Sequence, residues 1–532
     1  MAISISQIEA TLLALSIPLT YFLVVSKSEG RRQYSTLLKA LPAVGFRDEW
    51  FHGIRATFRS LFKTAEWASE GYSKFTKRDS PYLIPTMDRG TVVILPTEQM
   101  KTVGRLPEDQ LDVFGTLQEQ IQAKYTVRDQ RVVLDPYHRY LIPSQLTREL
   151  DILTGPMTTE LEDAFKSSWG TDSGWRDVTI WQACFHVVAR AANYALCGSP
   201  LCNDEKYLAS LEGQSVALFG GAMLISITPK LLRPVTGYLV KLWCAYYARN
   251  FAKICAPYIE ARIRETTQAK TWDDSSRKPV KDALQLIIDE AISRDDNTQL
   301  SASLISDRLL ITNNVSLHST TLTLHNLISS LITSDPSLGY IEALREECDK
   351  VLSDAGGTWN LEAIRKLRLV DSAIRESMRV APFGSIAMAR TVINPKGISI
   401  MHGKSSVIVP QGTILASPME SIHCDEDIYP DARHFNPFRF VDIEPKGSKS
   451  GDQRYVTTKP TATPDDYFFG FGTSKNPCPG RFLAVHEIKL IVAYLLTNYD
   501  IEYTKAKLQP TNLLAMKVPK MDALIRVRRR SV

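Results

Sequence analysis

The sequence lacks the cysteine patterns of a disulfide scaffold or a zinc site. It has eight cysteines in 532 residues, with no CxxC pair and no cluster of cysteine and histidine at finger-like spacing. In so long a chain, scattered cysteines indicate reduced and mostly buried thiols in a reducing compartment. A structural zinc protein is therefore disfavoured. The cysteines are Cys184, Cys197, Cys202, Cys244, Cys255, Cys348, Cys424 and Cys478.

An excess of charge of one sign is also missing. The chain has 63 Lys and Arg against 58 Asp and Glu, which gives a net charge of +5. Spread over such a length, this surplus does not indicate a nucleic-acid partner, and we expect none. The hydrophobic content of 44% is enough for a large globular protein with a substantial core.

Long hydrophobic runs are scarce, and the one candidate lies near the N-terminus. Residues 10–25 read ATLLALSIPLTYFLVV without a charge, and basic residues follow at once, beginning with Lys27. No positive charge precedes the run, which argues against a cleaved signal peptide. We expect an uncleaved membrane anchor with its flank in residues 1–30, and the body of the protein, residues 31–532, on the cytosolic side. A buried N-terminal helix is the alternative, and we expect no later membrane span.

Periodic apolar patterns predict a mainly helical chain with a minority of strand. Apolar residues at three- and four-residue spacing indicate helices, and short β-branched runs beside Gly and Pro indicate strands. The polar stretches 273–278 and 446–454 predict surface loops. Helices are expected at 177–196, 238–263, 280–293, 301–332, 360–380 and 484–496, and strands at 91–95, 406–409 and 524–527, the last as an edge strand.

The most informative cysteine closes a loop that leads into a predicted helix. Residues 468–483 read FFGFGTSKNPCPGRFL, so Gly470 and Gly472 precede Cys478, and an apolar helix follows. A cysteine binds metal as the thiolate, and the N-terminal end of a helix favours negative charge. Backbone N–H groups of the loop can point at the sulfur and tune its electron donation. Cys478 is thus a candidate metal ligand, although without its loop it would be interpreted as a small buried hydrophobic residue.

Two charged patterns precede this loop. Glu376 and Arg379 are three residues apart on the predicted helix 360–380, so their side chains share a face. The turn FNPFRF then carries Arg439, 39 residues before Cys478. A helical pair of this kind, taken alone, is a surface ion pair that contributes little stability. The order and spacing of the three patterns are what make them informative together.

These three patterns together resemble the cytochrome P-450 family. The family's cysteine signature is written FxxGxRxCxG, and Phe471, Cys478 and Gly480 fall on it, while CPGRFLA is similar to fungal members. Ser474 stands at a usual glycine and Asn476 at a usual basic residue. The resemblance implies the cytochrome P-450 fold, a large helical domain with a smaller β-containing region. It also implies a haem iron bound by Cys478.

The resemblance assigns roles to the charged residues as well. Glu376, Arg379 and Arg439 are expected to form a buried triad behind the haem, since the planar arginine fork can hold a carboxylate bidentately. Arg390 is a candidate partner of a haem propionate, with an ordinary surface arginine as an equal alternative.

A polar stretch in the predicted helix 301–332 resembles the family's oxygen-activating pattern, (A/G)GxD/E-T-T/S. Residues 314–321 read NVSLHSTT, and the best superposition puts His318 at the acidic position, Ser319 at the conserved threonine and Thr320 after it. A shift of one residue would give the key position to Thr320. A hydroxyl there hydrogen-bonds dioxygen and helps to deliver protons. Alternatively, the hydroxyls bond only the carbonyl one turn back, and His318 is an ordinary hydrogen-bonded histidine.

The resemblance implies a monooxygenase reaction. Two electrons from NADPH arrive through a separate NADPH-cytochrome reductase, one atom of dioxygen enters a C–H bond and the other leaves as water. Arg481 and Lys489 are expected to be docking cations for an acidic reductase. One alternative is a haem-thiolate isomerase or dehydratase that uses no dioxygen, against which Ser319 and Thr320 argue. The other is a non-catalytic haem-binding protein.

The terpenoid class of the substrate is implied by the resemblance alone, whereas its lipophilic nature and the membrane location rest on the predicted anchor and the apolar helices. The stretches WGTD (169–172) and GSPLCND (198–204) are similar to fungal cytochromes P-450 of secondary metabolism, with comparable stretches in the gibberellin and diterpenoid pathways. We therefore expect a lipophilic substrate, a terpenoid or indole-terpenoid. We also expect a single-pass anchor in the endoplasmic reticulum membrane, with the catalytic domain facing the cytosol.

Overall fold

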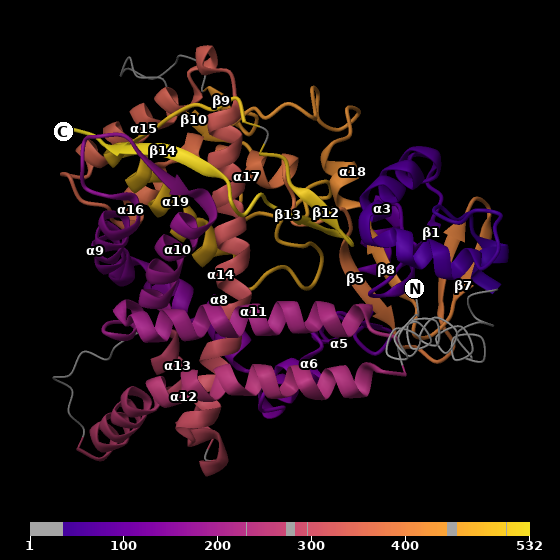
Figure 1. Cartoon of the computed structure of the whole chain (residues 1–532), viewed down its shortest axis with the longest axis horizontal. Helices are drawn as coiled ribbons and strands as arrows, with labels where there is room; N and C mark the ends of the chain where they lie inside the picture. Colours follow the sequence, from indigo (N-terminus) through magenta and orange to yellow (C-terminus); the bar gives the residue numbers. More distant parts are fainter. Residues whose placement is uncertain are drawn as a thin grey trace, which may run out of the picture.

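The computed structural model describes residues 36–229, 231–272, 282–294, 296–443, 455–506 and 508–531. The predicted anchor and the two predicted loops lie outside these residues. Within them helices dominate and strands are a minority, as the periodic patterns predict. Figure 1 shows the sheet that contains β1, β5 and β8 at one end of the molecule, and most of the long helices at the other.

Long helices form the larger part of the molecule, and α14 runs through their middle (Figure 1). The Ser301 side chain caps α14 by accepting a hydrogen bond from the Leu304 N–H, as the sequence boundary at residue 301 suggests. The long helices are α3 (His52–Lys74), α9 (Leu150–Trp169), α10 (Ile180–Cys197), α11 (Glu205–Ile227), α12 (Arg233–Trp272), α13 (Ala283–Ser293), α14 (Ala302–Thr333), α15 (Tyr340–Asp354), α17 (Arg368–Val380) and α19 (Arg481–Asn498). The shorter helices are α4 (Thr97–Val103), α5 (Phe114–Gln120), α6 (Ala123–Thr126), α7 (Arg131–Leu134), α8 (His138–Ser144), α16 (Leu361–Lys366) and α18 (Met419–His423).

A five-stranded sheet of order β1-β2-β8-β5-β3 forms the smaller part. Strand β2 pairs antiparallel with β1 and parallel with β8. Segments that are far apart in the sequence therefore lie side by side in the middle of the sheet. The sheet strands are β1 (Tyr82–Thr86), β2 (Gly90–Ile94), β3 (Leu111–Asp112), β5 (Ala387–Val392) and β8 (Ile414–Ser417). The others are β4 (Arg176–Thr179), β6 (Ile398–His402), β7 (Ser405–Val409), β9 (Val441–Ile443), β10 (Tyr455–Thr457), β11 (Tyr499–Ile501), β12 (Thr511–Leu513), β13 (Met516–Val518) and β14 (Leu524–Arg529).

One predicted helix and one predicted strand differ in detail from the structure, because each involves strand pairing that the sequence pattern does not show. The predicted helix 177–196 begins only at Ile180, because residues before it form β4. The C-terminal strand β14 is central rather than an edge, since it lies between β11 and β4. In both cases the partner strand is more than three hundred residues away along the chain, and local pattern carries no information on such pairing.

The predicted helix 360–380 is two helices. Leu367 separates α16 from α17 in an extended conformation. The Glu347 carboxylate, on α15, accepts hydrogen bonds from the N–H groups of Arg368, Leu369 and Val370 at the start of α17. A carboxylate on three free N–H groups satisfies that helix end and favours the break.

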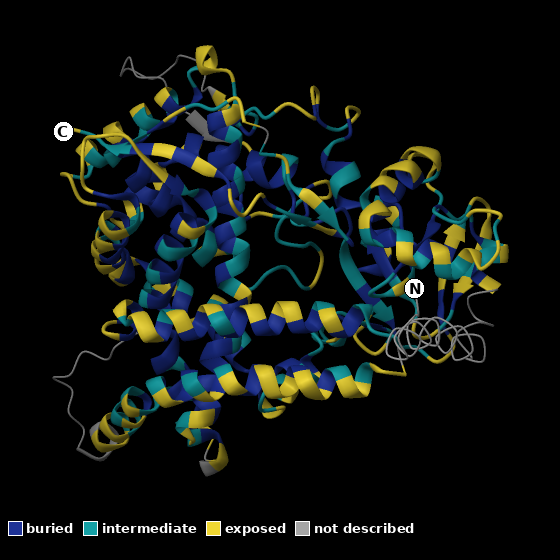
Figure 2. Ribbon diagram, in the orientation of Figure 1, coloured by how far each residue is buried: buried dark blue, intermediate teal, exposed yellow. Residues whose placement is uncertain are grey.

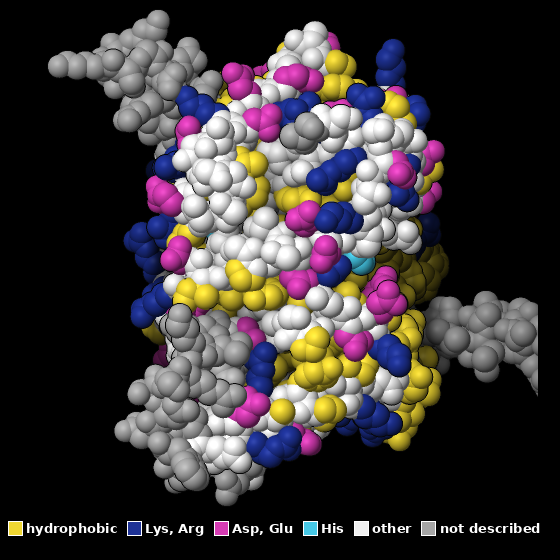
Figure 3. Space-filling view, turned by 90° about the vertical axis from the view of Figure 1, so that its left-hand side faces the viewer, with side chains coloured by type: hydrophobic (Ala, Val, Ile, Leu, Met, Phe, Trp, Pro, Cys, Tyr) yellow, Lys and Arg dark blue, Asp and Glu magenta, His cyan; other side chains and the backbone are white. Residues whose placement is uncertain are grey.

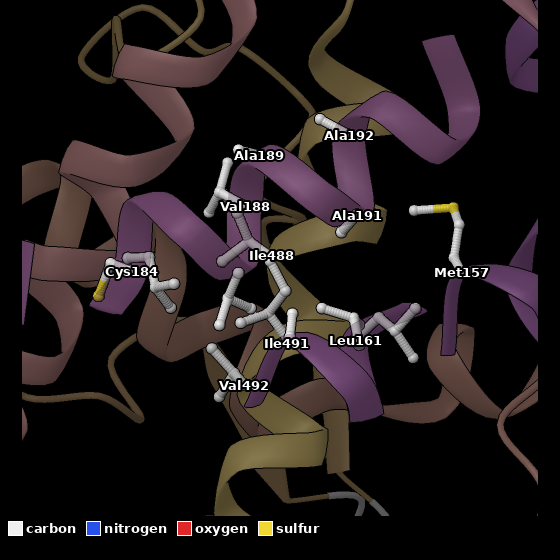
Figure 4. Close-up of a cluster of buried hydrophobic side chains, with 14 of the residues drawn as sticks. Met157, Leu161, Cys184, Val188, Ala189, Ala191, Ala192, Ile488, Ile491 and Val492 are labelled. Carbon is white, nitrogen blue, oxygen red and sulfur yellow. The ribbon is translucent and has the colours of Figure 1, made fainter. Parts of the chain in front are cut away.

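The core of the helical part fixes α19 against α9 and α10. Figure 4 shows their aliphatic side chains interleaved, with the alanines of α10 allowing close approach. Each fully buried aliphatic side chain contributes about 1.5–3 kcal/mol relative to exposure. This packing sets the position of the residues just before α19, including Cys478. The labelled residues are Met157, Leu161, Cys184, Val188, Ala189, Ala191, Ala192, Ile488, Ile491 and Val492.

Helices α11 and α12 form an antiparallel hairpin with one outward face (Figures 1 and 2). Among the described residues, α11 is the one helix long and apolar enough to cross a membrane. By length and composition, the expectation of no later candidate span is therefore wrong. Half of that stretch is buried against other helices, which is typical of a core helix of a globular domain.

Candidate active site

The cysteine loop wraps back on itself before α19. The Cys478 N–H donates to the Phe471 carbonyl at 2.7 Å, and the Gly472 N–H donates to the Phe469 carbonyl at 2.9 Å. Cys478 lies three residues before α19, whose N-cap is Gly480. Burial raises the pKa of the Cys478 thiol, while the N–H groups of Gly480 and Arg481 and the Arg481 charge oppose that rise. A thiol so placed ionises when it binds a metal cation.

The surroundings of Cys478 fit a large flat group such as haem. A Cβ placed on Gly480 would meet no described atom within 4 Å, and the Gly480 φ of −88° does not itself require glycine. The Gly480 backbone therefore faces open space two residues after Cys478.

Arg390 supplies a second observation in favour of haem. Arg390 lies on β5, and this strand passes close to the cysteine loop. Met388, on the same strand, has its Sδ 3.8 Å from the position that a Cβ on Gly472 of the loop would take. The Arg390 side chain is only 3% exposed, and its one hydrogen bond among the described residues goes to the Met388 carbonyl. Burial lowers its pKa with no carboxylate opposing. A buried guanidinium without an anion is suited to a haem propionate.

The charged residues of the predicted triad lie together. Arg379 donates to both Glu376 carboxylate oxygens at 2.7 Å, and the Arg439 Nε donates to Glu376 Oε1 at 3.0 Å. Glu376 and Arg379 are fully buried, and the Arg439 side chain is 13% exposed. Their remaining donors reach backbone carbonyls, of His423 and Ala432 from Arg379 and of Pro430 and Asp431 from Arg439. The three residues thus hold α17 to the chain segment around residue 430.

The hydroxyl-bearing stretch of α14 presents two residues differently. Ser319 is partly exposed, and its hydroxyl donates to the carbonyls of Val315 and Ser316. Thr320 is buried on another side of the helix. Thr323 and Asn326, four and seven residues after Ser319 and therefore on its face, line a narrow space with Gly470 of the cysteine loop.

His318 lies in an aromatic surround on the side of α10 and α11. Its ring stacks near Trp181 at 6.3 Å and meets Phe219 edge-on at 5.1 Å, with Phe185 at 5.8 Å. Its Nε2 is buried without a hydrogen-bond partner among the described residues. Burial lowers the pKa of His318, so this imidazole is neutral at physiological pH.

Comparison with known proteins matches residues 159–525 to the family described as cytochrome P450 (cytochrome P-450). The chain belongs to the cytochrome P-450 family. It is 39% identical over 506 residues to the cytochrome P450 (P-450) monooxygenase okaG of Penicillium ochrochloron, which covers 92% of this chain and 94% of that protein. Monooxygenase htyF of Aspergillus rugulosus is 33% identical, covering 92% and 72%, and gloP of Glarea lozoyensis is 30% identical, covering 92% and 90%.

Membership identifies the chemistry of the site in general terms. The relatives are named cytochrome P-450 monooxygenases, so this chain is an oxidoreductase of that kind. Members of the family carry haem iron, and NADPH serves as their electron source through a reductase. The expected fold, mainly helical with a smaller β region, is the one observed in the described residues of this cytochrome P-450.

One predicted docking cation of this cytochrome P-450 is wrong. Lys489 is buried on α19, with its Nζ 3.6 Å from an Asp371 carboxylate oxygen of α17. It therefore joins two helices and cannot meet a partner. Arg481 remains partly exposed, and its guanidinium donates to the Cys478 carbonyl at 2.9 Å.

The two departures from the family signature have different structural settings. Ser474 has φ +64°, the left-handed conformation that favours glycine, so the turn keeps its shape with a residue that strains it. A Cβ on Gly104, the residue that follows α4, would lie only 2.7 Å from the Ser474 Oγ. The absence of a side chain at Gly104 therefore lets the end of α4 approach the cysteine loop closely. Asn476 is partly buried, and no hydrogen bond of its side chain occurs among the described residues.

Sequence reasoning missed one buried cation that supports the loop. Arg375, next to Glu376, donates to the carbonyls of Pro460 and Thr463 and pairs with Asp465 at 2.6 Å. Its guanidinium also stacks 3.9 Å from the Phe468 ring, at the entry to the cysteine loop. These partners lie about ninety residues downstream, so no local signal distinguishes Arg375 from a surface arginine.

Proposed function

We propose that this chain is a membrane-held haem-thiolate monooxygenase of a fungal secondary-metabolite pathway, with Cys478 as the iron ligand. The observation that carries the proposal is the pairing of open space at Gly480, two residues after Cys478, with a buried Arg390 that has no carboxylate partner among the described residues. Haem held by a thiolate supplies activation of dioxygen and insertion of one oxygen atom into a C–H bond. Phe471 holds the ligand through its carbonyl, and Arg390 receives a propionate.

Ser319 is the better candidate for the oxygen-side hydroxyl. Its side chain is partly exposed on the face of α14 that leads toward Gly470, whereas Thr320 is buried elsewhere. The Ser319 hydroxyl donates to the Val315 or Ser316 carbonyl. A small rotation of the side chain would free this hydroxyl to donate to dioxygen instead. The neutral His318, whose Nε2 has no hydrogen-bond partner in the part of the chain that the structure describes, accepts or passes a proton next to Ser319.

The substrate is proposed to be lipophilic, and a terpenoid or indole-terpenoid in class. Next to His318 and Ser319, Val315 is 64% exposed and Phe219 of α11 is 41% exposed. Large apolar side chains that remain open beside a catalytic hydroxyl favour an apolar ligand. The stretch 169–172 begins at the last residue of α9, and 198–204 follows α10 and contains a short 3-10 helix. The terpenoid assignment rests on the family resemblance.

Membrane attachment and a reductase partner complete the proposal. The hairpin of α11 and α12 exposes apolar side chains along its outer face, including Leu232, Leu239 and Trp243, and such a face favours contact with a lipid surface. An anchor in residues 1–30 would hold residues 31–532 on the cytosolic side of the endoplasmic reticulum. Figure 3 shows Lys and Arg interspersed with Asp and Glu over one face, and Arg481 near the ligand is the proposed contact for an acidic reductase.

The carbon monoxide difference spectrum of the reduced holoprotein tests the ligand. Wild type should give the thiolate-ligated Soret band, and Cys478→Ser should lose it. Cys424→Ser is the matched control, because Cys424 is the other partly exposed cysteine of the described residues. A Cys478→Ser protein that retained the band would overturn the proposal.

Turnover with isotope-labelled dioxygen separates the proposed reaction from its alternatives. Reconstitution with a fungal reductase, NADPH and a panel of terpenoids should place one labelled oxygen in the product. Unlabelled product that forms equally well without dioxygen and NADPH would indicate the dioxygen-independent isomerase or dehydratase. A normal carbon monoxide band with no product from any lipophilic compound would indicate a haem-binding protein without activity.

A further inference from the structure

His423 links the charged triad to the cysteine loop. It ends α18 and is fully buried. Its backbone carbonyl accepts a hydrogen bond from Arg379, and its ring Nε2 accepts one from the Phe469 N–H at 3.0 Å. The Phe469 carbonyl in turn accepts from Gly472, inside the turn that leads to Cys478. One residue therefore touches both the triad and the entry of the loop.

The hydrogen bond to Phe469 fixes the tautomer of His423. An N–H donor requires an acceptor, so Nε2 is unprotonated and the ring proton lies on Nδ1. Nδ1 is buried with no hydrogen-bond partner among the described residues. An unsatisfied buried N–H is destabilising. An apolar ring would remove it but would leave the buried Phe469 N–H without an acceptor, so what a histidine supplies at this position is the acceptor on Nε2.

The surroundings keep the imidazole neutral. The Phe468 ring stacks on it at 5.5 Å with an interplanar angle of 12°, and Phe469 lies at 5.8 Å. The charged groups that face it are Arg379 and Arg375 of α17 and Asp465 of the following segment. Burial and the two guanidinium groups lower the pKa of His423 to about 3. The acceptor is thus present over the whole physiological range.

We propose that His423 is a positioning residue for the thiolate: its neutral Nε2 holds the Phe469 N–H and thereby sets where the loop presents Cys478. The inference rests on the proposed haem-thiolate function. The loop between Phe469 and Cys478 is closed by two short backbone hydrogen bonds, so a shift at its entry is passed to the N–H groups that face the sulfur. Those groups tune electron donation from a metal thiolate.

The experiment compares His423→Phe with His423→Gln in the full-length holoprotein. Phe keeps a ring on Phe468 but loses the acceptor, while Gln can place an oxygen where Nε2 stands. His486→Phe is the matched control, because His486 is also buried and bonds through Nε2 to the Thr154 hydroxyl, away from the loop. The readouts are haem content, the carbon monoxide Soret band and the midpoint potential of the haem iron.

We expect His423→Phe to bind haem with a shifted midpoint potential, a weakened thiolate band and turnover reduced about tenfold or more. His423→Gln should restore the band and the potential, and His486→Phe should lose stability without changing either. Equal effects of Phe and Gln, or a His423→Phe protein with wild-type band and potential, would overturn the inference. Should His423→Phe not fold, His423→Asn takes its place, since Asn cannot reach the Nε2 position. Wild type without a thiolate band would instead refute the proposed function itself.

Discussion

At the scale of single residues, the site depends on buried charge that is matched by geometry. Glu376 carries one negative charge against two guanidinium groups and also accepts the Asn436 N–H at 3.1 Å. The surplus positive charge is distributed over backbone carbonyls that Arg379 and Arg439 bond. Such a cluster costs desolvation free energy when formed, and it becomes strongly unfavourable when one partner is removed.

Arg439→Ala should therefore destabilise the holoprotein by about 3–5 kcal/mol and lower its haem content. The reason is that Glu376 would keep its burial while losing one cation and the Pro430 and Asp431 carbonyls would lose their donor. Denaturant unfolding and haem absorbance per protein measure both effects. Arg433→Ala, an exposed arginine of the same segment, is the control and should change neither; normal haem content in Arg439→Ala would contradict the role of the triad.

A second residue-scale prediction concerns the loop turn. Ser474→Gly should stabilise the protein, since a left-handed residue with a Cβ costs about 1–2 kcal/mol and the added freedom of glycine in the unfolded chain offsets about half of it. Ser474→Ala keeps the Cβ and loses the contact of the Ser474 hydroxyl with the Thr473 hydroxyl and its close approach to Gly104. The midpoint of denaturant unfolding should rise for Gly and not for Ala. A Gly variant no more stable than the Ala variant would show that the turn is not strained.

At the scale of elements, the spacing of apolar residues predicts a helix correctly where that helix buries one face or its whole surface. The predicted 301–332 and 484–496 correspond to α14 and α19 with shifts of a few residues at their ends, and 91–95 to β2. The misses share one cause, which is that a distant partner decides the boundary. Glu347 divides 360–380 by capping α17 from another helix, and β14 is central because β4 comes to it from residue 176.

The contact between α11 and α14 yields a prediction at this scale. Asn314, just before the proposed catalytic stretch, donates to the Gln214 side-chain oxygen at 2.8 Å and accepts from the Ser215 hydroxyl. All three side chains are buried. Asn314→Ala leaves two polar groups of α11 without partners, at about 1–3 kcal/mol each. Hydrogen exchange of the α11 amides should become faster.

Ser306→Ala is the control for that measurement, because the buried Ser306 hydroxyl bonds only its own helix, at the Ala302 carbonyl. It should leave the α11 amides protected. If hydrogen exchange of the α11 amides were unchanged in Asn314→Ala, apolar packing alone would be holding α11 against α14.

At the scale of the whole molecule, the sequence is informative where side chains recur in a known order and spacing, and silent where the partners are backbone groups of distant segments. Cys478, Glu376 and Arg439 carry a recognisable order and spacing. Arg375 and His423 act through contacts made across 85 and 46 residues, with a carbonyl and a backbone N–H group as partners. Backbone groups have no sequence identity, so such contacts leave no pattern to find.

The pH dependence of stability is set by groups buried across the molecule. Burial lowers the pKa of His138, His423 and His486 to about 3 each. Below pH 6.5 the unfolded chain protonates these histidines and the folded chain does not, so stability falls as pH falls. Burial raises the pKa of Glu487 to about 8. Between pH 4.5 and 8 only the unfolded chain ionises Glu487, so stability falls as pH rises.

The opposite slopes of these histidines and of Glu487 predict that stability passes through a maximum as pH rises, and Glu487→Gln should remove the fall that Glu487 causes on the alkaline side. Gln has the shape of the neutral carboxylic acid, so the variant should match wild type near pH 4 and gain about 1.4 kcal/mol for each pH unit above 4.5, up to pH 8. Urea unfolding of the holoprotein at several pH values measures the difference. Glu346→Gln, on an exposed position of α15, should follow the wild-type curve throughout. If Glu487→Gln did so too, the carboxyl group would have to be ionised in the folded protein, with a compensating cation close to it.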